Sequence, residues 1–100
     1  MADLKHDPAR AAEIAEILKA LSHATRLMIV ARLADGEANV GELSSCLGTP
    51  QALVSQQLRI LRMSGLVEFR REGGFAVYKL AKPHLVDLLQ CLERCRSAGN

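Results

Sequence analysis

The sequence predicts one mostly α-helical domain that carries a small β-hairpin near its C-terminal end. The chain has 100 residues, a length that suits a single compact domain. Hydrophobic residues make up 49% of the chain but aromatic residues only 3%, so we expect an aliphatic core. Apolar residues recur at helical spacing along most of the chain, and the spacing changes to alternation only between residues 66 and 80. The expected order is four helices, a hairpin and a last helix.

The first two helices are predicted over Ala9–Leu21 and His23–Ala34. Pro8 suits the first turn of a helix, and Asp7 before it can cap that helix. Ser22 can cap the second helix. The apolar residues at helical spacing are Ala11, Ile14, Ala15, Ile17, Leu18 and Leu21 in the first helix and Leu27, Val30, Ala31 and Ala34 in the second. An Asp-Gly pair at residues 35 and 36 then ends the second helix, because glycine can adopt the left-handed conformation that often follows a helix.

A short helix, a tight turn and a longer helix follow. The short helix begins at Val40 or Gly41 and ends at Leu47, and the turn Gly48-Thr49-Pro50 separates it from a helix over Gln51–Ser64. The buried face of the longer helix is expected to consist of Leu53, Val54, Leu58, Ile60 and Leu61. Two helices joined in this way form a helix-turn-helix, a motif whose second helix enters the major groove of DNA.

A β-hairpin and a last helix complete the domain. Leu66–Arg70 and Ala76–Leu80 alternate apolar and polar residues around Glu72-Gly73-Gly74, which is the pattern of a hairpin with a glycine turn. A Lys-Pro pair ends the second strand, and leucines at helical spacing predict a last helix from Leu85 to about Cys95. The ordered core is expected from about residue 9 to residue 96. A hairpin behind a helix-turn-helix predicts a winged helix-turn-helix domain.

The charge of the chain is distributed unevenly. The net charge is only +2, but residues 51–82 hold six Lys and Arg against two Glu, a net charge of +4. Residues 1–50 hold five Lys and Arg against seven Asp and Glu, a net charge of −2. A basic segment is the electrostatic pattern of a surface that binds a polyanion. Because this segment coincides with the second helix of the motif and with the hairpin, double-stranded DNA is the predicted partner.

The residue types of the basic segment suit two kinds of DNA contact. Uncharged side chains that donate and accept hydrogen bonds suit base edges or phosphates, and the candidates are Gln51, Ser55, Gln56 and Gln57. Arginines suit phosphates, and the candidates are Arg59 and Arg62 on the helix with Arg70 and Arg71 on the hairpin. The alternative is a winged helix that only docks other proteins. Such a module would present an uncharged or acidic face, and the four arginines argue against it.

Four motifs in consecutive order carry a family resemblance. They are LSHATRLMIV (Leu21–Val30), VGELS (Val40–Ser44), LVSQQLRILRMSGLV (Leu53–Val67) and REGGFAVYKL (Arg71–Leu80). Together they resemble the ArsR/SmtB family of small winged-helix repressors, and the similarity extends from about residue 12 to residue 95. The resemblance implies a homodimer, held by the first and last helices, that binds a palindromic operator. It also implies that a bound ion or a thiol reaction releases the DNA.

The resemblance adds residue assignments to those made from the residues alone. It assigns Gln51, Ser55 and Gln56 to DNA contact and places Arg70, Arg71 and Gly74 on the wing. The apolar residues expected in the dimer interface are Ile14, Ile17, Leu88 and Leu92. A domain this small cannot cover the apolar faces of its first and last helices by itself.

The sensor of such a repressor is incomplete in this sequence by comparison with the family. The two cysteines of the family's arsenic-type site correspond to Asn39 and Gly41, so that site is absent. The four ligands of its zinc-type site correspond to Lys82, His84, Cys95 and Ala98, so two potential ligands survive. A zinc site in a protein normally has four ligands.

Two cysteines of the last helix can supply a sensor of another composition. Cys91 and Cys95 are four residues apart, so they share one helical face. The resemblance implies that His84 of one subunit approaches Cys95 of the other. Thiolates suit a Zn(II), Cd(II) or As(III)-type ion, while thiol oxidation or a persulfide is the alternative signal. The competing interpretation is that both cysteines are small hydrophobic residues in the dimer interface. Cys46 lies at core spacing and is expected to be packed.

Other protein classes fit the sequence poorly. There is no Gly-rich phosphate loop, nucleophile elbow or HExxH motif, so no enzymatic activity is expected. No apolar run approaches about 20 residues, the length needed to cross a membrane. The first residues lack a secretory signal, and three cysteines do not form a disulfide scaffold, so a reducing cytoplasm is the expected compartment. The predicted function is that of a dimeric repressor released from DNA by a thiol-directed inducer.

Overall fold

The computed structural model describes residues 3–98 and contains five α-helices and three strands. The helices are α1 (Pro8–Leu21), α2 (Ala24–Ala34), α3 (Val40–Leu47), α4 (Gln51–Met63) and α5 (Leu85–Ala98). The strands are β1 (Ala38–Asn39), β2 (Val67–Glu72) and β3 (Phe75–Leu80), and one 3-10 turn, η1 (Leu4–His6), precedes α1. The predicted order of helices and hairpin is confirmed, and η1 and β1 are additions to it.

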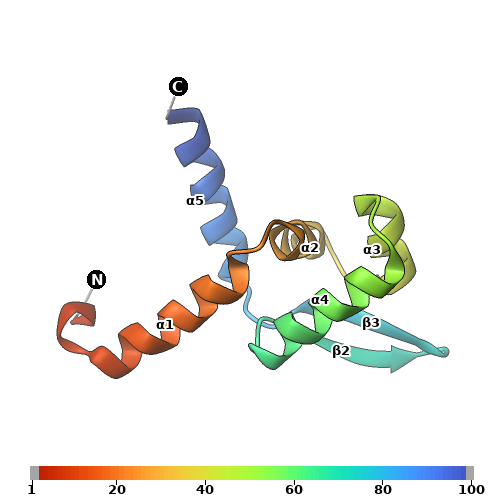
Figure 1. The fold of residues 1–100 in the computed structure, drawn as a ribbon, viewed down its shortest axis with the longest axis horizontal. Coiled ribbons are helices and arrows are strands. Elements are labelled where there is room, and N and C mark those ends of the chain that lie inside the picture. The colour runs from red at the N-terminus through yellow and green to blue at the C-terminus, as the bar shows by residue number, and fades with distance from the viewer. Residues whose placement is uncertain (1–2, 99–100) are drawn as a thin grey trace.

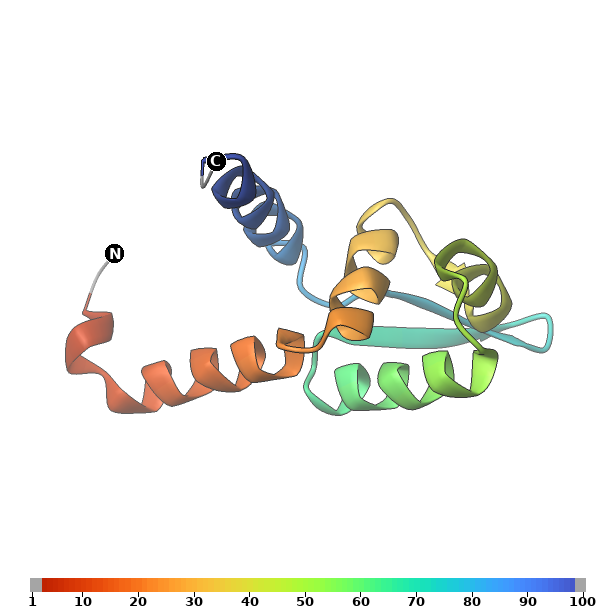
Figure 2. The same ribbon diagram turned by 45° about the horizontal axis from the view of Figure 1, so that its top comes forward.

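The molecule has a compact body from which two helices project. In the body, α2, α3 and α4 gather around the small sheet, while α1 and α5 leave it in different directions (Figures 1 and 2). Both projecting helices pack against α2 at their body ends. The helices expected to hold a dimer together are therefore the two that have the fewest neighbours within the chain.

The caps of the helices agree with the sequence in one case and differ in another. The Asp7 carboxylate accepts a hydrogen bond from the Arg10 backbone N–H at 3.0 Å, so the predicted cap of α1 is confirmed. Ser22 does not cap α2, because its hydroxyl donates to the Lys19 carbonyl at 2.7 Å and closes the end of α1. The cap of α2 is His23, whose Nδ1 accepts from the Thr25 backbone N–H.

The core is aliphatic, as expected, but the faces that α2 and α4 turn to it differ from the predicted ones. In α2 the buried residues are Ile29, Val30 and Leu33, whereas Ala31 of the predicted face is exposed. In α4 the buried positions are 54, 57, 58 and 61, which follow helical spacing. Leu53 and Ile60 are 37% and 36% exposed, so the prediction that they are buried is wrong.

The sheet is three-stranded and antiparallel, in the order β1-β3-β2. β1 was not predicted from the sequence, and it pairs Ala38 with Tyr78 of β3. The hairpin strands extend further towards the turn than predicted, so that Glu72 pairs with Phe75 and only two residues remain in the turn. Gly73 and Gly74 have φ angles of +57° and +86°, and positive φ at both positions is what a two-residue hairpin turn of this kind demands.

No helix within residues 3–98 is long and apolar enough to cross a membrane.

Candidate nucleic-acid interface

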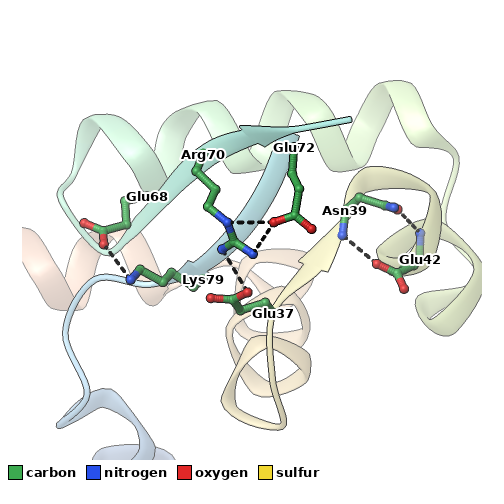
Figure 3. Close-up of polar contacts among 7 residues, drawn as sticks. All are labelled: Glu37, Asn39, Glu42, Glu68, Arg70, Glu72 and Lys79. Atoms are coloured by element: carbon green, nitrogen blue, oxygen red, sulfur yellow. Dashed lines mark hydrogen bonds and ion pairs between the residues drawn. The ribbon is translucent and has the colours of Figure 1, made fainter. Parts of the chain in front are cut away.

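The helix-turn-helix is held by local polar contacts. Asn39 caps α3 by accepting a hydrogen bond from the Glu42 N–H at 2.8 Å, and Glu42 accepts one from the Asn39 N–H at 2.9 Å (Figure 3). Gly48 ends α3 with a φ of +63°, in the left-handed region that favours glycine. The Ser44 hydroxyl donates to the Thr49 carbonyl across the turn, and α4 begins directly after Pro50. These contacts fix the direction in which α4 leaves α3.

The outer face of α4 carries most of the residues that were predicted to contact DNA. The exposed candidates on this helix are Gln51, Ser55, Gln56, Arg59 and Arg62. α4 runs alongside the β2–β3 hairpin in both views (Figures 1 and 2), and Arg62 of α4 reaches the hairpin at Phe69. Their contact with DNA remains a prediction.

Gln57 does not belong to that exposed face. Its side chain is buried, with 6% of its surface exposed, and its Oε1 accepts a hydrogen bond from Arg26 at 2.8 Å. The Arg26 Nε also donates to the Ala20 carbonyl at 2.5 Å. A side chain enclosed in this way cannot reach a base, so the prediction that Gln57 binds DNA is wrong. Arg26, which the sequence analysis did not single out, instead ties together the end of α1, α2 and α4.

The hairpin has two chemically different faces because side chains alternate along a strand. Phe69 and Arg71 of β2 share a face with Tyr78 of β3, which packs against the core. The Phe69 and Tyr78 ring centroids lie 5.4 Å apart. The guanidinium carbon of Arg62, from α4, lies 5.0 Å from the Phe69 centroid, and that of Arg71 lies 5.9 Å from it. One face of the hairpin therefore joins an arginine of α4 to an arginine of the wing.

The opposite face of the hairpin carries ion pairs, and Arg70 lies in it. Arg70 donates to Glu72 at 2.8 and 3.0 Å and pairs with Glu37, which precedes β1, at 2.9 Å (Figure 3). The hydrogen bonds to Glu72 and Glu37 raise the pKa of Arg70 above its usual value. Lys79 and Glu68 pair beside them at 3.4 Å. Arg70 and Arg71, both predicted to contact phosphates, therefore lie on opposite faces of the hairpin.

The remaining arginines of this region carry no such compensation. Within residues 3–98, none of Arg59, Arg62 and Arg71 forms an ion pair with a carboxylate. Gly74 lies in the turn at the tip of the hairpin, where the wing was expected to end. The outer face of α4 and the adjoining face of the wing thus combine hydrogen-bonding side chains with uncompensated positive charge, as a DNA-binding surface requires.

The predicted dimer residues lie on the two projecting helices. Ile14 and Ile17 of α1 and Leu88 of α5 are half-buried, whereas Leu92 of α5 is 48% exposed. Leu18, which was not among the predicted interface residues, is 52% exposed. Leu18 and Leu92 are thus large apolar side chains that the chain itself leaves exposed.

A groove of about 610 Å³ adjoins these residues, between α2 and α5. Its apolar lining includes Leu27, Met28, Ala31, Val86, Leu89 and Leu92. Met28, which was not part of the predicted apolar face of α2, is 44% exposed. Of the predicted interface residues, Leu92 of α5 lines this groove.

The sensor candidates are accessible but do not form a metal site within one chain. Cys91 and Cys95 are exposed on α5, and the His84 side chain is 96% exposed, with its Nδ1 3.6 Å from the Asp87 carboxylate. No group of three or more His, Cys, Asp and Glu side chains among the described residues is arranged to hold a metal ion. Cys46 is also exposed, so the prediction that it packs in the core is wrong.

A helix-turn-helix followed by a β-hairpin with an arginine-bearing face defines a winged helix-turn-helix DNA-binding domain. Residues 23–68 match the family described as "Bacterial regulatory protein, arsR family". A "Biofilm growth-associated repressor" of Xylella fastidiosa is 46% identical over 83 residues, which cover 83% of this chain and 73% of that protein. The chain belongs to the ArsR family, as its motifs suggested.

Solved structures support the same assignment. The crystal structure of the transcriptional repressor BigR from Xylella fastidiosa matches with a TM-score of 0.81 at 44% identity, over 86% of this chain and 88% of that one. The solution structure of Mb0332 from Mycobacterium bovis, a homodimeric winged helix-turn-helix DNA-binding domain, matches with a TM-score of 0.81 at 31% identity, over 100% of this chain and 96% of that one. The family consists of DNA-binding transcriptional regulators and not of enzymes, which confirms the predicted class.

Proposed function

We propose that this protein is a repressor that binds a palindromic DNA operator as a homodimer and leaves it when a metal or metalloid ion binds its cysteines. The observation that carries DNA binding is the outer face of α4, where Ser55 and Gln56 are exposed on the same helix as Arg62, which meets the wing residue Arg71 over the Phe69 ring. Hydrogen-bonding side chains in the major groove read bases, while the arginines hold phosphates. The similarity to proteins named as repressors supports the direction of control.

The homodimer follows from the projecting helices and from the shape of an operator. α1 and α5 leave the body and carry apolar side chains that the chain itself leaves uncovered, among them Leu18 and Leu92. The similar domain Mb0332 is homodimeric. Two copies of α4 related by a twofold axis would lie in successive major grooves of one DNA face, about 34 Å apart. The operator is therefore expected to be a palindrome with that half-site spacing.

The release of DNA is assigned to the thiols of α5. Cys91 and Cys95 are exposed on a helix that the dimer would place at its centre. Because residues 3–98 of one chain offer no group of three donors, a Zn(II), Cd(II) or As(III)-type ion would need donors from both subunits, with His84 as the third candidate. Such an ion supplies a bond between the subunits, and a change at that contact alters the angle between the two copies of α4.

Thiol oxidation or persulfide formation is the second candidate signal, and the exposure of the thiols favours it. A disulfide between Cys91 and Cys95 within one intact helix would be strained. Side chains four residues apart in a helix have Cβ atoms about 5–6 Å apart, whereas a disulfide needs about 3.8 Å. Oxidation would therefore require a fraying helix end, an inter-subunit bond or a polysulfide bridge. Metal or metalloid binding needs no such distortion, so we favour it.

DNA binding is tested by selecting duplexes from a random library and titrating the selected palindrome against the scrambled duplex by fluorescence anisotropy at several salt concentrations. We expect a preference for the palindrome and an affinity that falls steeply with salt, because bound phosphates release counterions. Gln56→Ala should relax the preference at one base pair per half-site, at a cost of about 1–3 kcal/mol. Binding that is absent, or that ignores salt, would refute the proposal and favour a protein-docking module.

The signal is tested by native mass spectrometry of the dimer with Zn(II), arsenite or a persulfide donor. An adduct of one ion per dimer or per subunit that also dissociates the DNA complex supports the metal or metalloid proposal. Mass increments of sulfur or loss of hydrogen from the thiols would instead support the oxidative alternative. A dimer that stays unmodified under all three additions would show that the inducer is something else.

A further inference from the structure

We propose that Phe69 is a positioning residue that holds Arg62 and Arg71 as one phosphate-binding pair between α4 and the wing. The inference rests on the proposed DNA binding and deepens it, because it names the side chain that sets the geometry of the two arginines. Arg62 belongs to α4 and Arg71 to β2 of the wing, so neither element contains both arginines. The juxtaposition exists only where the ring of Phe69 lies between the two elements.

The geometry places both guanidinium groups over one ring. The Arg62 guanidinium carbon lies 5.0 Å from the Phe69 centroid, and the Arg71 guanidinium carbon lies 5.9 Å from it. Both distances fall within the range, about 6 Å, in which a cation is attracted by the negative face of an aromatic ring. The ring itself is half-buried and rests against Tyr78, at 5.4 Å between centroids. Phe69 is therefore a fixed platform, whereas the two arginines are exposed side chains.

The charges around the hairpin favour the same interpretation. Two like charges near one ring repel each other, and carboxylates nearby would be expected to compensate them. The two glutamates of the hairpin, Glu68 and Glu72, instead lie on the opposite face, where they pair with Lys79 and Arg70 (Figure 3). Within the described residues, Arg62 and Arg71 have no carboxylate partner. The compensating anion is thus left to a ligand, and the phosphates of DNA supply anions that guanidinium groups bind.

A platform of this kind improves binding by preorganisation. A long arginine side chain loses rotamer freedom when it binds a phosphate, and one that already stacks on a ring loses less. The contribution is independent of base sequence, because phosphates carry no sequence information. Phe69 should therefore affect operator and non-operator DNA equally, unlike Gln56.

The hairpin supplies a matched control in Phe75. It belongs to the same hairpin, but it pairs with Glu72, lies on the opposite face from Phe69 and is 62% exposed. No cation of the described residues lies over its ring. Phe75→Leu removes an aromatic ring from the wing without touching the proposed platform.

The test measures dissociation constants of Phe69→Leu, Phe69→Tyr and Phe75→Leu by fluorescence anisotropy, on the selected palindrome and on a scrambled duplex. Each cation–π contact at an exposed site accounts for about a threefold change in affinity, so Phe69→Leu should weaken binding to both duplexes by about fivefold to tenfold for each subunit of the dimer that contacts the DNA. Phe69→Tyr keeps the ring and should bind within about twofold of the wild type. Phe75→Leu should bind like the wild type.

A thermodynamic cycle separates positioning from a general loss of structure. In a protein that already carries Arg62→Ala and Arg71→Ala, Phe69→Leu should have no further effect on affinity. A further loss of the same size in that background would overturn the inference, as would an unchanged affinity of Phe69→Leu in the wild-type background. The melting temperature of each variant is measured alongside, and if Phe69→Leu does not fold, Phe69→Met makes the same comparison with an unbranched side chain that fills irregular space.

The outcome for the wild type distinguishes this inference from the function on which it rests. If the wild type binds neither duplex in a salt-dependent way, the proposed DNA binding is refuted. If the wild type binds and Phe69→Leu binds as tightly, only the role of Phe69 is refuted.

Discussion

Two neighbouring glutamines on α4 should behave in opposite ways when they are replaced. Gln56 is exposed on the outer face of the helix, whereas Gln57 is buried and accepts a hydrogen bond from Arg26. We therefore expect Gln57→Leu to destabilise the fold and Gln56→Leu to weaken DNA binding with little effect on stability. The two changes are chemically identical and lie one residue apart, so each is the control for the other.

The magnitude follows from the bond that Gln57→Leu removes. Leucine is similar in size to glutamine and suits the apolar surroundings of Val54, Leu58 and Leu61, so the lost packing is small. The Arg26 group that donated at 2.8 Å loses its acceptor in a partly buried place. A hydrogen bond to a charged group contributes about 1.5–3 kcal/mol to stability. A loss of about 2 kcal/mol lowers the Tm of a domain of this size by roughly 8–16 °C.

The assay is thermal and urea unfolding at one fixed protein concentration, because the Tm of a dimer depends on concentration. A double-mutant cycle with Arg26→Met isolates the pair, and we expect a coupling energy of about 1.5–3 kcal/mol between Arg26 and Gln57. Gln56→Leu should change stability by less than about 0.5 kcal/mol. Equal Tm values for the two leucine variants, or a coupling energy below about 0.5 kcal/mol, would refute the buried role of Gln57.

Three further predictions concern the dimer, the wing and the thiols. Leu92→Glu should give a monomer by analytical ultracentrifugation and abolish specific DNA binding, since two half-sites need two copies of α4, and a dimeric variant would contradict the interface. Arg71→Ala should weaken all DNA sequences alike and flatten the salt slope by about 1.8, because the dimer loses one phosphate contact in each half-site. Arg70→Ala should change the slope far less, and equal slopes would contradict the two-faced hairpin. Cys91→Ser combined with Cys95→Ser should bind DNA but no longer release it with arsenite or Zn(II), and normal release in a gel-shift assay would place the sensor elsewhere.

The order of the elements could be predicted from the sequence because each signal is local. Helical spacing, the Asp7 cap, the Gly48 break and the two-glycine turn depend on residues within a few positions of one another, and each is present in the structure. The resemblance rested on motifs of the same local kind, which is why it gave the family correctly. Strand β1 was missed because two residues form it only by pairing with β3, far along the chain.

The face that each element turns to the core depended on packing between elements. Helical spacing on α4 was compatible with burial of Leu53 and Ile60 or of the position held by Gln57. The structure buries Gln57, because Arg26 of α2 supplies the donor that a buried amide needs. From sequence alone a polar residue such as Gln57 is assigned to the surface, because the partner that allows its burial is distant in the chain. Here that partner, Arg26, lies 31 positions away.

The candidate DNA-binding surface could likewise be predicted from the sequence only in part. The residue types of a DNA-binding helix and a basic wing were evident from the sequence, since they require only composition and order. Which arginine of the hairpin has carboxylate partners was decided by the alternation of β2 and by Glu37, which the pairing of β1 brings to Arg70. The stacking of Arg62 and Arg71 on Phe69 likewise joins two elements that only the folded chain places together. Structure that depends on neighbouring residues can be predicted from the sequence, whereas contacts between distant residues form only when the chain folds around its core.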